Sequence, residues 1–123
     1  MESLATIDVR QHDGVSLVRI CGEIDTSNVS DVGEALATAA PSNGLGLIVD
    51  LSGVTYLNSA MIKSLFDLAE QLRQRQQRLG LVMDEGAPMR KLLLLLKLDL
   101  VVPLDHTNDD AVARIKGARA GGG

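Results

Sequence analysis

The chain has very few aromatic side chains and a single cysteine: one Phe, one Tyr, no Trp and one Cys in 123 residues. With Cys21 alone, it cannot form an intrachain disulfide or a thiolate metal cluster, which fits a reducing, cytoplasmic setting. A nucleic-acid-binding surface combines basic with aromatic side chains, whereas this chain has a net charge of -4. We therefore expect a cytoplasmic protein that does not bind nucleic acid.

Long apolar runs are missing as well. The longest, from Leu92 to Leu104, is interrupted by Lys97, Asp99 and Pro103, so we expect no insertion into a membrane. The N-terminus lacks the basic region followed by an apolar region that marks a signal peptide. Both observations argue against a protein that enters or crosses a membrane.

The motifs of common enzyme classes are absent too. The chain contains no glycine-rich phosphate loop, no dinucleotide fingerprint and no nucleophile–base pair. Its two histidines, His12 and His106, have no second ligand at metal spacing and are expected to be solvated. Asp25 and Asp50 resemble a carboxylate pair, but without a partner His we interpret them as capping residues. We expect no cofactor, no bound metal and no enzyme activity.

The apolar pattern predicts a single domain over residues 1–118, followed by a disordered Gly-rich tail at 119–123. Alternating or continuous apolar runs predict strands at residues 5–10, 15–21, 45–51, 79–83 and 101–104. Apolar residues at helical spacing predict helices that begin near residues 29, 59, 89 and 108. The order is therefore strand–strand–helix, followed by three alternating strand–helix units.

This order predicts a mixed α/β fold with largely parallel core strands, an N-terminal hairpin and about four helices, because strand–helix–strand units require right-handed crossovers. The turn signal of the hairpin is His12-Asp13-Gly14. Pro103 places the last strand at or near a sheet edge, because proline cannot donate to a strand ladder. Gly80 lies near the expected end of the second helix.

The most informative segment runs from Asp50 to Ile62. It starts in a buried apolar strand and ends in an amphipathic helix, and we expect a short polar loop between them. Asn58 and Ser59 fall at the helix entrance, where Asn58 can cap the helix and the Ser59 hydroxyl is accessible. The helix dipole and free backbone N–H groups can accommodate a phosphate there. Ser59 is thus either a plain helix-start residue or a switch controlled by phosphorylation.

Two stretches of this sequence resemble the STAS domain family, which includes bacterial anti-sigma-factor antagonists. One resembles the family's Gly-Glu-hydrophobic-Asp element after the second strand, and its residues are Gly22-Glu23-Ile24-Asp25-Thr26. The other resembles the family's phosphorylation segment, and its residues are Asp50-Leu51-Ser52-Gly53-Val54-Thr55-Tyr56-Leu57-Asn58-Ser59-Ala60. The usual pattern there is Asp-Leu-Ser-Gly-hydrophobic-x-aromatic-hydrophobic-Asp-Ser-Ser/Ala/Thr-Gly-hydrophobic.

The resemblance implies a reversible switch. In the family, a serine kinase that is also the anti-sigma factor phosphorylates the serine aligned with Ser59, and a PP2C-type phosphatase resets the cycle. The unphosphorylated antagonist binds the kinase and frees a sigma factor. The resemblance therefore implies that Ser59 is the phosphoacceptor. It also implies a set of partner-binding residues, which are Glu23, Asp25, Thr26, Ser27, Asn58, Ala60 and Met61.

Two residues depart from the family pattern: Asn58 stands where Asp is usual, and Met61 stands where Gly is usual. Asn58 keeps a capping oxygen but removes a charge beside Ser59. Met61 is expected to add a large apolar group near the docking surface. The departures keep a second function open, in which the STAS module is a non-phosphorylated scaffold or an accessory subunit of a transporter or stress-signalling complex.

The run Leu92-Leu93-Leu94-Leu95-Leu96 cannot fit on one face of a helix. Two interpretations remain open. Either the C-terminal helix covers the extra leucines, or they form a patch for a partner or for a weak homodimer. We expect Leu93 or Leu94 to point outward.

Overall fold

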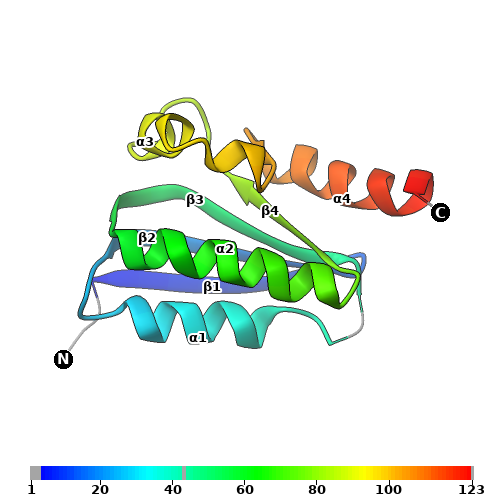
Figure 1. Cartoon of the computed structure of the whole chain (residues 1–123), viewed down its shortest axis with the longest axis horizontal. Helices are drawn as coiled ribbons and strands as arrows, with labels where there is room; N and C mark the ends of the chain where they lie inside the picture. Colours follow the sequence, from blue (N-terminus) through cyan, green and yellow to red (C-terminus); the bar gives the residue numbers. More distant parts are fainter. Residues whose placement is uncertain (1–3, 43, 123) are drawn as a thin grey trace.

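The computed structural model describes residues 4–42 and 44–122 of the chain. Within these residues, the strands of the sheet are β1 (Ala5–His12), β2 (Val15–Ile24), β3 (Gly46–Leu57), β4 (Arg78–Val82) and β5 (Leu104–Asp105). The helices are α1 (Val29–Ala39), α2 (Ser59–Gln74), α3 (Arg90–Leu95), the short 3-10 helix η1 (Leu98–Leu100) and α4 (Asn108–Gly122) (Figure 1). This order confirms the predicted alternation of strands and helices.

The sheet is mixed, as the sequence predicted. β1 and β2 form an antiparallel hairpin, and β2, β3, β4 and β5 follow as parallel neighbours in that order. Asp13 and Gly14 both have positive φ (51° and 83°), which suits a two-residue turn between right-twisted strands. β5 lies at the edge of the sheet, where Pro103 led us to place the last strand.

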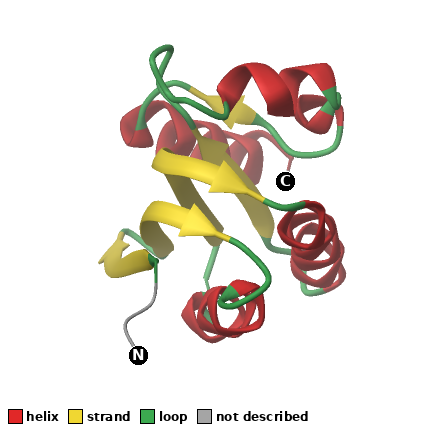
Figure 2. Cartoon of the chain, turned by 90° about the vertical axis from the view of Figure 1, so that its left-hand side faces the viewer, coloured by secondary structure: helices red, strands yellow, loops and turns green. Residues whose placement is uncertain are grey.

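Helices cover both faces of the sheet (Figure 2). On β3, Leu47 and Val49 belong to the main core cluster, which also contains the buried residues of α1, α2 and α3. Ile48, which points to the opposite face, belongs to a second cluster with Ile115 of α4. The burial of alternate β3 residues on opposite faces confirms that this strand lies inside the fold.

β3 is longer than predicted, because it stays paired with β2 beyond Leu51. The pairing continues to Tyr56 and Leu57, which lie opposite Glu23 and Ile24 after two irregularities of register. The predicted polar loop between strand and helix is therefore wrong, and a single residue separates β3 from α2. The long-range pairing of β2 with β3 outweighs the turn-forming character of this segment.

Two glycines lie inside strands, and one of them marks close packing. A Cβ at Gly53 would lie 2.6 Å from Sγ of Cys21 on β2, closer than real Cβ atoms come. Gly80 lies inside β4, where a Cβ would be in ordinary contact, 3.7 Å, with Ile115 of α4, and the expectation that α2 ends near Gly80 places its end several residues too late. α2 instead ends ahead of Gln76, which takes the left-handed conformation (φ 61°).

The two C-terminal α-helices end at other residues than predicted. α3 ends at Leu95, and Lys97 adopts the left-handed conformation (φ 60°) before η1 begins. α4 continues to Gly122, past its expected end near Lys116 and into the segment predicted as a disordered tail, while Gly123 lies outside the described residues. No helix in the described part of the chain is long and apolar enough to cross a membrane.

The leucine run is mostly exposed. Of the five leucines at residues 92–96, all of which the structure describes, Leu93 alone is buried. Leu94 is exposed, which confirms the expectation that Leu93 or Leu94 points outward. α4 packs on β3, β4 and β5 in a separate cluster with Ile48 and Val82. The interpretation that the C-terminal helix covers the leucines is therefore wrong.

Candidate functional site

The residues predicted to form the site lie where β2 and β3 end. Because the two strands are parallel, their carboxyl ends meet at one end of the sheet, and Ile24 is paired with Leu57. The Asn58 N–H donates to the Ile24 carbonyl at 3.1 Å, which ties the two strand ends together. Figure 2 looks at this end, where β2 leads into α1 and β3 leads into α2. We call residues 23–28 and 55–60 the β2–β3 end.

Asn58 caps α2, as the sequence predicted. Its backbone is extended (φ -89°, ψ 172°), and its Oδ1 accepts a hydrogen bond of 2.9 Å from the Met61 N–H. Ser59 is the first residue of α2 and is exposed. Within the described residues, its hydroxyl has no hydrogen-bond partner, and the first turn of α2 carries no acidic side chain. The hydroxyl is therefore accessible and lies at the positive end of the helix dipole.

Met61 does not lie on this surface. Its side chain is fully buried and belongs to the main core cluster. Helical spacing puts Met61, Leu65, Leu68 and Leu72 on the buried face of α2. The buried stripe of α2 therefore begins at Met61, while Ile62 is only partly buried. The expectation that Met61 contacts a partner is therefore wrong.

A buried asparagine, Asn28, organises the loop between β2 and α1. It is 3% exposed; its Oδ1 accepts from the Asp25 N–H and its Nδ2 donates to the Glu23 carbonyl, both at 2.9 Å. Sequence reasoning missed this residue, although an Asn directly before a helix is a signal for side-chain-to-backbone bonding. Asn28 thereby holds the segment from Glu23 to Asp25 in one conformation.

The Asp25 carboxylate is bound within the same loop. Its Oδ1 accepts hydrogen bonds from the Ser27 hydroxyl at 2.5 Å and from the Ser27 N–H at 2.9 Å. These bonds, the hydroxyl first, hold the pKa of Asp25 below its usual value, so the carboxylate is charged at neutral pH. Glu23 and Thr26 are exposed beside it. The loop is therefore acidic and rich in hydroxyl groups.

Neither aspartate of the suggested carboxylate pair is arranged for acid–base chemistry. Asp50 accepts from the Ser52 N–H at 2.9 Å and from Nδ2 of Asn108 at 3.4 Å, while Asp25 is occupied by Ser27. Asp25 thus acts within its loop, as the capping interpretation expected, whereas Asp50 lies inside β3 and does not cap a strand end. Among the described residues, no group of three or more His, Cys, Asp or Glu side chains is placed to hold a metal ion.

Tyr56 adds an aromatic side chain to the β2–β3 end. It lies on β3 opposite Glu23, and about half of its surface is exposed. Sequence reasoning did not select it, although it occupies the aromatic position of the phosphorylation segment. Exposed aromatic side chains are common in protein–protein interfaces, and Tyr56, like Ser59 and Ala60, is accessible at the β2–β3 end.

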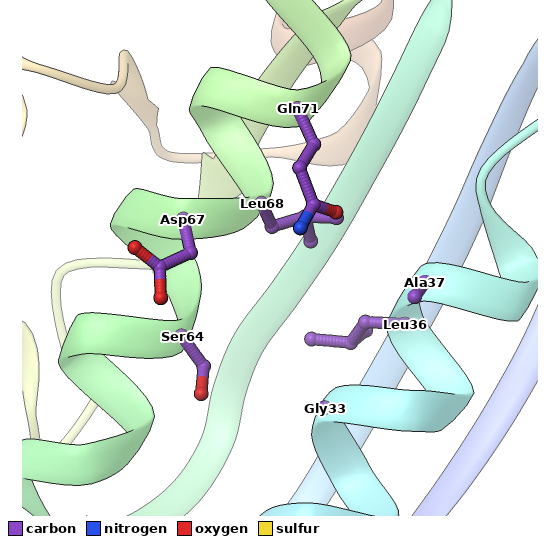
Figure 3. Close-up of a pocket in the computed structure, with 7 residues that line it drawn as sticks. All are labelled: Gly33, Leu36, Ala37, Ser64, Asp67, Leu68 and Gln71. Carbon is purple, nitrogen blue, oxygen red and sulfur yellow. The ribbon is translucent and has the colours of Figure 1, made fainter.

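A shallow groove of about 210 Å³ lies between α1 and α2. In Figure 3, polar side chains of α2 face small residues of α1 across it; the lining residues are Gly33, Leu36, Ala37, Ser64, Asp67, Leu68 and Gln71. Asp67 also pairs with Lys63 of α2 at 3.0 Å. Because both helices start at the β2–β3 end, the groove extends the accessible surface away from Ser59.

Comparison with known proteins assigns this arrangement to a family. The family model of the STAS domain matches residues 6–111, which is most of the chain. The chain belongs to the STAS domain family. Its sequence is 32% identical over 114 residues to the anti-sigma-F factor antagonist RsfB of Mycobacterium tuberculosis, an alignment that covers 93% of this chain and 92% of RsfB.

Solved structures share the STAS fold. A crystal structure of an anti-sigma factor antagonist from Mycobacterium paratuberculosis has a TM-score of 0.81 at 33% identity, covering 91% of this chain and 94% of that chain. The unphosphorylated form of the antagonist SpoIIAA has a TM-score of 0.72 at 18% identity, covering 91% of this chain and 97% of that chain. At 18% identity, the likeness to SpoIIAA shows the fold alone.

The cap of α2 is expected to contribute measurably to the stability of this STAS domain. Asn58→Asp is expected to leave the melting temperature nearly unchanged, because either side chain accepts the Met61 N–H. Asn58→Ala is expected to lower the free energy of unfolding by about 1 kcal/mol, because it removes the acceptor. Urea unfolding followed by circular dichroism measures both values. Equal stability of Asn58→Ala and wild type would contradict the cap.

Removing the buried hydrogen bonds of Asn28 is also expected to destabilise the STAS domain. Asn28→Ala is expected to lower the free energy of unfolding by about 1–3 kcal/mol, because it leaves the Asp25 N–H and the Glu23 carbonyl without this partner. Ser30→Ala, at an exposed position of α1, is the control and should cost little. If urea unfolding gives both variants the same stability, Asn28 does not organise the loop.

Proposed function

We propose that this STAS protein is a cytoplasmic anti-sigma factor antagonist that binds an anti-sigma factor serine kinase and thereby frees a sigma factor. The observation that carries the proposal is the similarity to RsfB, at 32% identity over 93% of the chain. The 33% identity to the Mycobacterium paratuberculosis antagonist supports it. The absence of the motifs of common enzyme classes from the sequence favours a binding protein over an enzyme.

The proposed docking surface is the β2–β3 end. Two loops meet there, since Ile24 pairs with Leu57 and Asn58 bonds back to Ile24. Asn28 and Asn58 hold the two loops in fixed conformations, so the surface is ordered before binding. The proposed contact residues are Glu23, Asp25, Thr26, Ser27, Tyr56, Asn58, Ser59 and Ala60.

Ser59 is the proposed phosphoacceptor. Its hydroxyl is exposed and lacks a hydrogen-bond partner among the described residues, so a kinase can reach it without unfolding α2. In the transfer, the Ser59 oxygen forms a bond to the γ-phosphorus of ATP, the hydroxyl proton is released, and ADP leaves. The helix dipole stabilises the new phosphate at the first turn, so the fold survives the modification.

Phosphorylation is proposed to act through charge. A phosphate adds about -1.5 to -2 charges at neutral pH. The β2–β3 end already carries the exposed Glu23 and the ionised Asp25, so the modified surface becomes strongly negative. A partner that fits the neutral hydroxyl would have to desolvate this charge, and binding weakens. A PP2C-type phosphatase restores the hydroxyl, which stays accessible at the helix start.

Mass spectrometry after incubation with the cognate anti-sigma factor and ATP tests the proposal. The wild-type chain should gain one phosphate on Ser59, and Ser59→Ala should gain none. Ser64→Ala, which changes a second serine of α2 away from the helix start, is the matched control and should be phosphorylated like wild type. A phosphate at any other position, or none on the wild type, contradicts Ser59 as the acceptor.

A non-phosphorylated STAS scaffold is the second candidate function. Two observations favour it: Asn58 replaces the aspartate of the family pattern, and four leucines of residues 92–96 are exposed in the part of the chain that the structure describes. The scaffold reading predicts that the chain binds its partner equally well before and after incubation with ATP. The antagonist reading predicts that ATP weakens the complex.

A further inference from the structure

β1 is an edge strand whose outer side is open. Among the described residues it pairs with β2 alone, and Figure 2 shows it at the edge of the sheet beside the N-terminus. Its eight residues include no proline and no glycine, and its register with β2 runs without a bulge. Proteins often block a regular edge strand with a proline or a bulge, because an open edge can pair with another strand. β1 carries neither block.

The hydrogen-bonding groups of β1 alternate between its two sides. The Leu4 carbonyl, just before β1, accepts a hydrogen bond of 3.1 Å from the Glu23 N–H on β2. Because an antiparallel ladder bonds at every second residue, the even-numbered residues of β1 bond to β2. The N–H and C=O groups of Ile7, Val9 and Gln11 therefore point away from the sheet. They offer three alternate residues to an added strand.

The side chains beside this edge give an added strand an apolar surface. Ile7 and Val9 are 37% and 47% exposed, and they lie opposite Ile20 and Val18 on the face of the main core cluster. An open groove of about 580 Å³ separates β1 from α1 on this face; its lining residues are Val9, Gln11, Asp31, Glu34, Ala35, Thr38 and Ala39. A strand laid along β1 would bury Ile7 and Val9 and place side chains in the groove.

We propose that the added strand is β1 of a second copy, antiparallel to the first about a two-fold axis through Val9. This register places Asp8 opposite Arg10 of the second copy, and the reverse contact forms at the same time. On the other face, Ile7 lies opposite Gln11 of the second copy. The neighbouring registers, centred on Asp8 or on Arg10, would place like charges opposite each other, which is destabilising. The sequence of β1 thus selects Val9 as the centre.

The charges around the edge keep this contact weak. Asp8 and Arg10 form an exposed ion pair within β1 at 3.0 Å, so the second copy extends an existing pair into a group of four charges. Asp31 and Glu34 are exposed on the α1 side of the groove and repel their equivalents in the second copy. Solvent and salt screen both effects. We therefore expect a dimer that forms at high concentration and dissociates on dilution.

Sedimentation equilibrium tests the pairing of the edges. We expect wild type to be dimeric at about 0.5 mM and monomeric at about 5 µM, as suits a weak interface. Val9→Pro should be monomeric at both concentrations and keep its circular dichroism spectrum, because proline removes an N–H that the fold itself does not use. Val9→Thr, which keeps the N–H and a β-branched side chain, is the matched control and should dimerise like wild type.

Charge reversal tests the register. Arg10→Glu alone and Asp8→Lys alone should each dimerise about tenfold more weakly than wild type, because each places like charges opposite each other. An equimolar mixture of the two variants should regain wild-type association, because both cross-contacts then join opposite charges. Arg19 of β2 lies opposite Asp8, so the melting temperature is measured to confirm that Asp8→Lys is folded.

Three results would overturn the proposal. The first is a wild-type chain that stays monomeric at about 0.5 mM. The second is a folded Val9→Pro variant that dimerises like wild type, because the contact then lies elsewhere on the molecule. The third is a mixture of folded Arg10→Glu and Asp8→Lys variants that associates no better than either variant alone, because the two strands then do not meet in this register.

Discussion

Ser59→Asp is expected to bind the anti-sigma factor about tenfold or more weakly than wild type, whereas Ser59→Ala should bind within about twofold. The aspartate places a permanent charge on the β2–β3 end, beside Glu23 and the ionised Asp25. Isothermal titration calorimetry of the full chain with its cognate anti-sigma factor measures the three affinities. Three equal affinities would contradict the role of Ser59.

The control for this experiment separates the site from a general effect of charge. Ser42→Asp introduces the same change at an exposed position just before β3, at the other end of the sheet. It should bind like wild type. Circular dichroism should show that both aspartate variants are folded, because a negative charge at the start of α2 is favourable. Equal weakening by Ser42→Asp would mean that net charge, and not the site, controls binding.

Leu93→Lys is expected to cost several kcal/mol of unfolding free energy and to leave little folded protein. Leu93 is 0% exposed in the main core cluster, so the variant buries an unpaired charge. Leu95→Lys, two positions along, should change the free energy by less than about 0.5 kcal/mol because its side chain is exposed. Urea unfolding measures both variants, and a similar loss for both would contradict the orientation of α3.

The parts of the fold that depend on local patterns were predictable from the sequence. The apolar run in β3 predicted a strand buried on both faces, and Asp13-Gly14 predicted the hairpin turn. Asn58 predicted the cap of α2, because capping needs one acceptor and one backbone N–H three residues later. Each of these features is determined by residues that are close in sequence.

Features that depend on tertiary pairing were not predictable. The extension of β3 to Leu57 requires β2 alongside, and the exposure of the leucines at residues 92–96 depends on where α4 packs. Asn28 was missed because its role depends on the path of the loop that it holds. Met61 was misplaced because a rotation of the α2 stripe by one residue changes which side chains are buried.

The two departures from the family pattern have different consequences in the structure. Met61 fills the core beneath α2, so it changes the packing of the helix and leaves the docking surface unaltered. Asn58 keeps the capping bond to the Met61 N–H and removes only the charge that Asp would bring. Asn58 is therefore the departure that lies on the proposed docking surface.

Release of a sigma factor is the most direct test of the proposed function. The cognate anti-sigma factor is first loaded with its labelled sigma factor, and this chain is then added while fluorescence anisotropy reports the bound label. We expect unphosphorylated wild type to release the sigma factor as its concentration rises, and Ser59→Asp to release much less. If saturating amounts of unphosphorylated wild type leave the sigma factor bound, the chain is not an anti-sigma factor antagonist for that partner.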